Sequence, residues 1–201
     1  MSRLLLVRHG DTKSNSAARF WGQTDIELSD SGIKQAEQLR DRLSTEKIDT
    51  IYSSNSCRAS KSARIIASRH QLSVITCNEL REINFGNFEG LTFKEISQLY
   101  PELAESWFTQ NLSFQFPGGE SIVELNNRVN KFLHRLEKHA PEETILIVAH
   151  SGVLRLLICN VLGIEPWHWR QIRIDLASLS IVETYPEIAI LSLLNDVSHL
   201  R

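Results

Sequence analysis

Two histidines in this 201-residue chain each stand just beyond a short run of apolar residues. His9 follows the run at residues 4–7, after Arg8, and His150 follows directly on the run at residues 144–149. Such runs are typical of buried strands, and open α/β sheets bind ligands beyond the carboxyl ends of their strands. Histidine can act there as a nucleophile or a proton carrier. The pattern predicts that both histidines belong to one site.

Two arginines point to an anion at that site. Arg8 precedes His9, and Arg58 stands at the start of a helix expected after a strand at residues 50–52. A solvated arginine would be unfavourable there, beside the positive end of the helix dipole, unless an anion is bound. Guanidinium groups match phosphate oxygens in a bidentate fashion. Arg8, Arg58 and the two histidines therefore predict a phosphate pocket.

The composition indicates an ordinary soluble globular protein. The chain is 42% hydrophobic, 23% charged and 7% aromatic. Its net charge of −2 argues against nucleic acid or an anionic membrane as a partner. The four apolar residues before Arg8 are too few for a signal-peptide core or a membrane span. Cys57, Cys77 and Cys159 form no metal-ligand pattern, so we expect a cytoplasmic enzyme without metal or cofactor.

The elements that must position these residues alternate along the chain. Strands are expected at residues 3–7, 50–52, 72–76, 144–149, 179–185 and 188–194. Helices are expected at 29–44, 58–70, 93–99, 101–107, 121–139 and 151–162. This order predicts an α/β three-layer sandwich, a mainly parallel sheet with helices on both faces and an antiparallel edge. We expect a single domain over residues 1–201, with a helical insertion at about 91–120 over the active site.

The segment from Leu6 to Thr12, with Asn15 following, resembles the signature of the histidine phosphatase superfamily, also called the phosphoglycerate mutase-like family. Further segments resemble that family in its own order: Ser53-Ser54 with Arg58-Ala59, Leu80-Arg81-Glu82 with Phe85-Gly86 and Phe88-Glu89-Gly90, and Val148-Ala149-His150. The resemblance extends from residue 4 to about residue 155. Asp11 stands where many members have glutamate.

The resemblance implies a role for each matching residue. His9 would be the nucleophile, with one ring nitrogen held by a backbone carbonyl such as that of Gly10, and Glu82 the proton donor. Arg8, Arg58 and His150 would form the phosphate pocket, and Asn15 and the amide of Ser151 would add contacts to the phosphate. Trp21, Gly22 and Gln23 would line the substrate side. The expected activity is metal-independent hydrolysis of a small phosphate monoester through a phosphohistidine.

Several alternatives stay open on the sequence. A phosphoglycerate mutase needs further cations, yet between Glu82 and Arg128 the only basic residue is Lys94, so we expect no second cationic group on the substrate side. The turn at residues 22–25 and the segment 117–121 most resemble α-ribazole phosphatases of cobalamin nucleotide-loop synthesis, which predicts α-ribazole 5′-phosphate as substrate. Fructose-bisphosphate or broad-specificity phosphatases and a non-catalytic phosphate-binding regulator are the other candidates, and a homodimer is compatible with the sequence.

Overall fold

In the computed structural model, which describes residues 2–14, 19–109 and 114–201, six strands form one sheet in the order β3-β2-β4-β1-β5-β6. The strands are β1 (Ser2–Arg8), β2 (Thr50–Ser54), β3 (Val74–Cys77), β4 (Thr144–Ala149), β5 (Leu179–Thr184) and β6 (Ala189–Asp196). The first four run parallel, whereas β5 and β6 are antiparallel to their neighbours. The predicted sheet with its antiparallel edge is confirmed.

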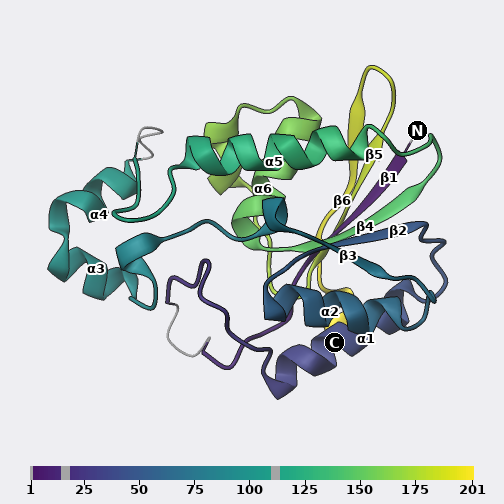
Figure 1. Cartoon of the computed structure of the whole chain (residues 1–201), viewed down its shortest axis with the longest axis horizontal. Coiled ribbons are helices and arrows are strands. Elements are labelled where there is room, and N and C mark those ends of the chain that lie inside the picture. Colours follow the sequence, from purple (N-terminus) through teal and green to yellow (C-terminus); the bar gives the residue numbers. More distant parts are fainter. Residues whose placement is uncertain (1, 15–18, 110–113) are drawn as a thin grey trace.

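Helices cover both faces of the sheet (Figure 1). Helices α1 (Asp30–Leu43) and α2 (Cys57–Ala67) pack on one face, and α5 (Ile122–Leu136) and α6 (Ser151–Leu162) on the other. Neighbouring residues of β1 face opposite ways, so Leu5 and Val7 contact the first helix layer while Leu4 and Leu6 contact the second. All six residues of β4 are buried, which explains its unbroken apolar run.

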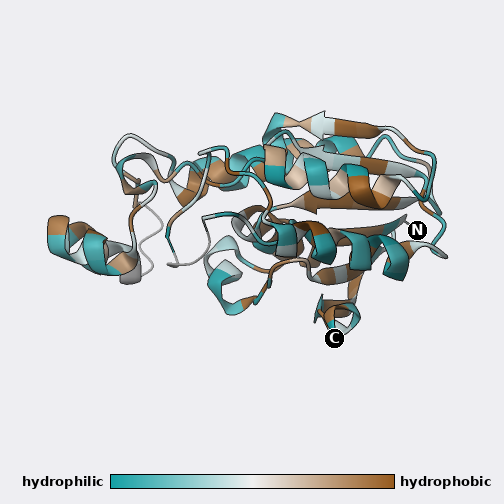
Figure 2. Cartoon of the chain, turned by 90° about the horizontal axis from the view of Figure 1, so that it is seen from below, coloured by the Kyte–Doolittle hydropathy of each residue, from teal (hydrophilic) through white to brown (hydrophobic). Residues whose placement is uncertain are grey.

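Helices α3 (Phe93–Leu99) and α4 (Pro101–Phe108) lie at one end of the molecule, away from the two helix layers (Figure 1). A capping box formed by Thr92 and Glu95 begins α3, and Pro101 begins α4. Hydrophilic residues gather on the outward turns of the helices that cover the sheet (Figure 2). Among the described helices, none combines the length and the apolar character that a bilayer crossing requires.

The ends of two helices differ from the sequence-based prediction. Helix α5 ends at Leu136 rather than at residue 139, and α2 ends at Ala67 rather than at residue 70. After α5, the His139 ring turns in to contact the Tyr52 hydroxyl group at 2.9 Å and the Glu143 carboxylate. These tertiary contacts hold residues 137–139 outside the helix.

Candidate active site

The two histidines meet because β1 and β4 are neighbouring parallel strands. Arg8 pairs with Ala149 in the strand register, so His9 and His150 are the next residues at the same edge. Their ring centroids are 5.0 Å apart, and their exposed fractions are 6% and 0%. The predicted pairing of the two histidines at the carboxyl edge of the sheet is confirmed.

The His9 ring is held in one tautomer by its own backbone segment. Its Nδ1 lies 2.7 Å from the Gly10 carbonyl oxygen, which only accepts, so Nδ1 carries the proton and Nε2 keeps a free lone pair. A Cβ at Gly10 would lie 2.4 Å from the Gly32 carbonyl oxygen, so this close approach requires glycine. Burial, followed by the charges of Arg8 and Arg58, lowers the pKa of His9 well below 6.5, so the imidazole is neutral.

His150 contacts two serine hydroxyl groups through one ring nitrogen. Its Nε2 lies 3.0 Å from Ser54 Oγ and 3.1 Å from Ser56 Oγ, while its buried Nδ1 has no hydrogen-bond partner in the described part of the chain. Burial and the nearby Arg58 lower the pKa of His150 well below 6.5. If a serine hydroxyl donates to Nε2, the neutral ring carries its proton on Nδ1 and offers a donor without a partner.

These two neutral histidines should make the protein less stable in mild acid. The unfolded chain takes up protons below about pH 6.5, whereas the buried rings do not, so the free energy of unfolding should fall with decreasing pH. Each histidine contributes a slope of at most about 1.4 kcal/mol per pH unit. When urea unfolding is measured from about pH 8 to 5, the free energy of unfolding should fall less steeply for His150→Gln than for the native chain. Equal slopes would contradict the buried neutral state.

The two arginines of the predicted phosphate pocket are fixed by backbone carbonyls. Arg58, 2% exposed, donates from Nη1 to the Thr24 carbonyl at 2.9 Å and from Nη2 to that of Gly22 at 2.6 Å. Arg8 donates from Nη1 to the Ile174 carbonyl at 2.8 Å. Neither arginine forms an ion pair within the described residues. Their charge is therefore available to an anion.

Glu82 is buried beside the start of α6, with only 8% of its surface exposed. One carboxylate oxygen accepts from the Gly152 amide at 3.2 Å, and the other accepts from the Ile83 amide at 3.1 Å. Ser151, the first residue of α6, has an amide without an intrahelical partner, and the positive end of the helix favours a negative group there. Glu82 and Ser151 thus line one cavity at the start of α6.

The predicted substrate-side segment makes mainly internal contacts. The amides of Gly22 and Gln23 donate to the Glu89 carboxylate at 3.1 and 2.9 Å, and the Trp21 indole donates to the Ser14 carbonyl at 3.1 Å. Phe20, rather than Trp21, lines the cavity beside Glu82. Asn15 lies outside the described residues. The substrate contacts expected of this segment stay predictions.

The cavity beside Glu82 and Ser151 has a volume of about 450 Å³ and largely aromatic walls. Helix α3 contributes Phe93 and α4 contributes Trp107. The other aromatic wall residues are Phe20, Phe85 and Trp169. Trp169 is buried against Trp107 and also lines the cavity.

Two arginines that the sequence does not point to also line this cavity. Arg170 stacks over the Trp107 ring at 3.6 Å, and Arg155 lies 5.8 Å from the Trp169 ring centroid. Neither has an ion pair within the described residues, and burial and the charge of Arg155 lower the pKa of Arg170. The cavity beside Glu82 therefore has cations that the single basic residue between Glu82 and Arg128 does not predict, whereas the expectation about the substrate side stays a prediction. The spacing of Arg155, one helical turn after Ser151, is the signal that could have found it.

Residues 4–197 match the histidine phosphatase superfamily, branch 1. The chain therefore belongs to this superfamily, which makes it a hydrolase of phosphate esters. Phosphoserine phosphatase 1 of Hydrogenobacter thermophilus is 34% identical over 200 residues, which cover 100% of this chain and 95% of that protein. Phosphoglycerate mutase-like protein 4 of Arabidopsis thaliana is 37% identical over 78% of this chain and 69% of its own length. The crystal structure of the α-ribazole phosphatase from Shigella flexneri superposes with a TM-score of 0.90 at 31% identity, covering 96% of each chain.

Proposed function

We propose that this chain hydrolyses a small phosphate monoester through a phosphohistidine on His9. The observation that carries the proposal is the state of that ring, a buried neutral imidazole whose Nδ1 donates to the Gly10 carbonyl and whose Nε2 therefore keeps its lone pair. Arg8 and Arg58 lie near it, as the lowering of the His9 pKa by their charges indicates. A non-catalytic phosphate binder would not need a nucleophile prepared in this way.

In the first step, His9 Nε2 attacks phosphorus, a P–N bond forms, and the bond from phosphorus to the ester oxygen breaks. Glu82, in its protonated form, gives its proton to the departing alkoxide. Arg8, Arg58 and the Nδ1–H of His150 stabilise charge on the transferring phosphoryl oxygens, and the Ser151 amide adds a further donor.

In the second step, water attacks the phosphohistidine and its proton passes to the Glu82 carboxylate. The P–N bond breaks, inorganic phosphate leaves, and the His9 ring returns to its neutral state. Glu82 is then protonated again for the next cycle. No step of this cycle requires a metal ion, because fixed hydrogen-bond donors stabilise the charge on the phosphoryl oxygens.

For the substrate, we propose α-ribazole 5′-phosphate, as expected from the sequence. The five aromatic residues of the 450 Å³ cavity offer a large apolar surface beside Glu82, which suits a flat, mostly neutral base. The similarity to the Shigella flexneri α-ribazole phosphatase supports this choice. This substrate carries a single anionic group on a large, mostly neutral remainder.

A second candidate follows from the positive charges of Arg155 and Arg170, which line the same cavity. A monoester with a second anionic group, such as the carboxylate of phosphoserine, would pair with them. The similarity to phosphoserine phosphatase 1 of Hydrogenobacter thermophilus supports this candidate.

Side-by-side kinetics on α-ribazole 5′-phosphate, phosphoserine, 3-phosphoglycerate and fructose bisphosphates should separate the two candidates. If the first is the substrate, its kcat/KM should exceed the others at least about tenfold, and Arg155→Met should change that value little. If a carboxylate is bound, Arg155→Met should lower kcat/KM for phosphoserine by a factor that corresponds to about 1–3 kcal/mol of lost transition-state stabilisation. The substitution would leave an unpaired anion in the cavity. Para-nitrophenyl phosphate, which has no second anion, is the control, and a complete lack of turnover would favour the non-catalytic binder.

Activity should survive dialysis against a strong chelator. In the part of the chain that the structure describes, no group of three or more histidine, cysteine or acidic residues is placed to hold a metal ion. Loss of turnover that only a divalent ion restores would contradict the proposed mechanism.

We also propose a reducing cytoplasmic location. Cys57, Cys77 and Cys159 are unpaired. Burial, with a hydrogen bond to Asp25, raises the pKa of the Cys57 thiol to about 11, so this thiol is not activated.

A further inference from the structure

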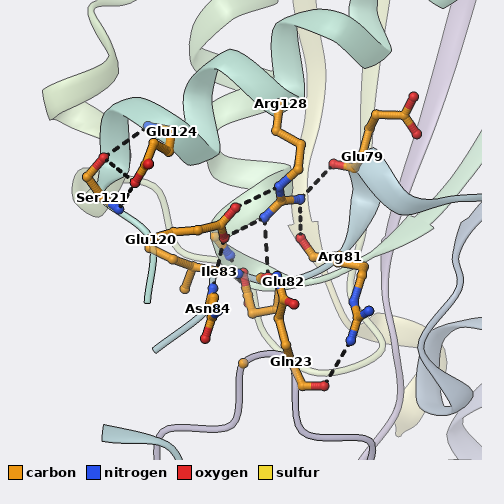
Figure 3. A network of polar contacts seen from close by, with 12 residues as sticks. Gln23, Glu79, Arg81, Glu82, Ile83, Asn84, Glu120, Ser121, Glu124 and Arg128 are labelled. Atoms are coloured by element: carbon orange, nitrogen blue, oxygen red, sulfur yellow. Dashed lines mark hydrogen bonds and ion pairs between the residues drawn. The ribbon is translucent and has the colours of Figure 1, made fainter. Parts of the chain in front are cut away.

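The loop that carries Glu82 is irregular, yet its backbone is held at four points by one arginine and one glutamate. Residues 81–85 form neither a helix nor a strand. Arg128 of α5 donates from Nη1 to the carbonyls of Glu79 and Arg81 at 2.9 and 2.7 Å, and from Nη2 to that of Glu82 at 3.3 Å. Figure 3 shows these bonds converging on the Arg128 guanidinium.

Glu120 completes this arrangement. Its carboxylate accepts from Arg128 Nε at 3.0 Å and from Nη2 at 2.8 Å, and it also accepts from the Asn84 amide at 2.9 Å (Figure 3). The five bonds made by Arg128 use every N–H donor that a guanidinium group has. The side chains of Arg128 and Glu120 are only 18% and 20% exposed, so the pair is shielded from water.

We propose that Arg128 and Glu120 are positioning residues for Glu82 and set where its carboxyl group meets the leaving oxygen. The inference rests on the proposed function, in which Glu82 is the proton donor. Three consecutive peptide groups around Glu82 are fixed by bonds that leave its carboxyl group free to contact the amides of Gly152 and Ile83. Proton transfer needs the donor within hydrogen-bond reach of the leaving oxygen, and a displacement near 1 Å can cost on the order of 10²-fold in rate.

Arg128→Lys tests this inference, because lysine keeps the charge but cannot reproduce the planar fork. The variant should lose on the order of 10²-fold in kcat on an alkyl phosphate, with little change in KM, and much less on para-nitrophenyl phosphate. The good leaving group of the latter hardly needs a proton. Glu120→Gln should show the same selectivity with a smaller loss, and it tests the inference if Arg128→Lys does not fold.

Arg135→Lys is the matched control. Arg135 lies two turns further along α5, and it contacts the Glu79 side chain, which precedes the loop, at 2.8 Å. Its replacement should leave kcat on both substrates unchanged. The double variant Glu82→Gln/Arg128→Lys should be no slower on the alkyl phosphate than Glu82→Gln alone, since the positioning residue acts through the carboxyl group.

The outcomes separate the inference from the proposed function. If folded Arg128→Lys slows both substrates equally while Glu82→Gln is selective for the alkyl phosphate, Arg128 is purely structural and the positioning inference is overturned. An additive loss in the double variant would overturn it as well. If Glu82→Gln itself slows both substrates equally, the proton-donor role fails, and the inference fails with it.

Discussion

His9→Ala should abolish turnover, with kcat reduced by a factor on the order of 10⁴ or more, because the attacking nitrogen is lost. A reaction of the native chain with ³²P-labelled substrate, stopped rapidly, should leave protein-bound phosphate that is stable in base and labile in acid. The same experiment on His9→Ala should yield no labelled protein.

His134→Ala is a suitable control, since the His134 side chain is 73% exposed on α5 and pairs with the equally exposed Glu137. This variant should label as the native chain does. Acid-labile label that persists in folded His9→Ala would place the nucleophile on another residue and remove the central step of the mechanism.

Arg58→Met should lower kcat on the order of 10²-fold or more, the scale expected when a preorganised donor to a charged transition state is lost. The substitution also leaves the Gly22 and Thr24 carbonyls without their donor, so the free energy of unfolding should fall by about 1–3 kcal/mol. Steady-state kinetics and urea unfolding on the same preparation measure the two effects separately.

Arg64→Met, six residues later on the exposed side of α2, gives the comparison. It removes a positive charge from the same helix at a position outside the site, so kcat should stay near that of the native chain. A folded Arg58→Met enzyme with native kcat would show that Arg58 serves only to hold the segment from Gly22 to Thr24.

Local patterns along the chain were sufficient to predict much of this fold. The apolar run of β4 and the alternating helical spacing of α5 each reflect burial by a neighbouring layer, so they can be recognised without the structure. The ends of α2 and α5 were less predictable, because contacts such as that of His139 with Tyr52 come from distant parts of the chain.

The candidate site, like the fold, could be predicted only in part from local patterns. His9 and His150 could be placed together, since both follow strands whose carboxyl ends share one edge of the sheet. Arg155 and Arg170 belong to no motif and were not predicted, although the one-turn spacing from Ser151 could have indicated Arg155. The five-bond arrangement of Arg128 was equally hidden, because three of its five acceptors are backbone carbonyls, which leave no trace in the residue types.

The position of β1 in the sheet also bears on how the protein is made. β1 pairs only with β4 and β5 among the described strands, and these begin at residues 144 and 179. At ribosomal rates of about 5–20 residues per second, the apolar β1 segment waits roughly 7–30 s for its first neighbour to be synthesised. His9, the proposed nucleophile, is thus synthesised long before His150, and the two histidines meet only through strand contacts that close the chain between them into one loop.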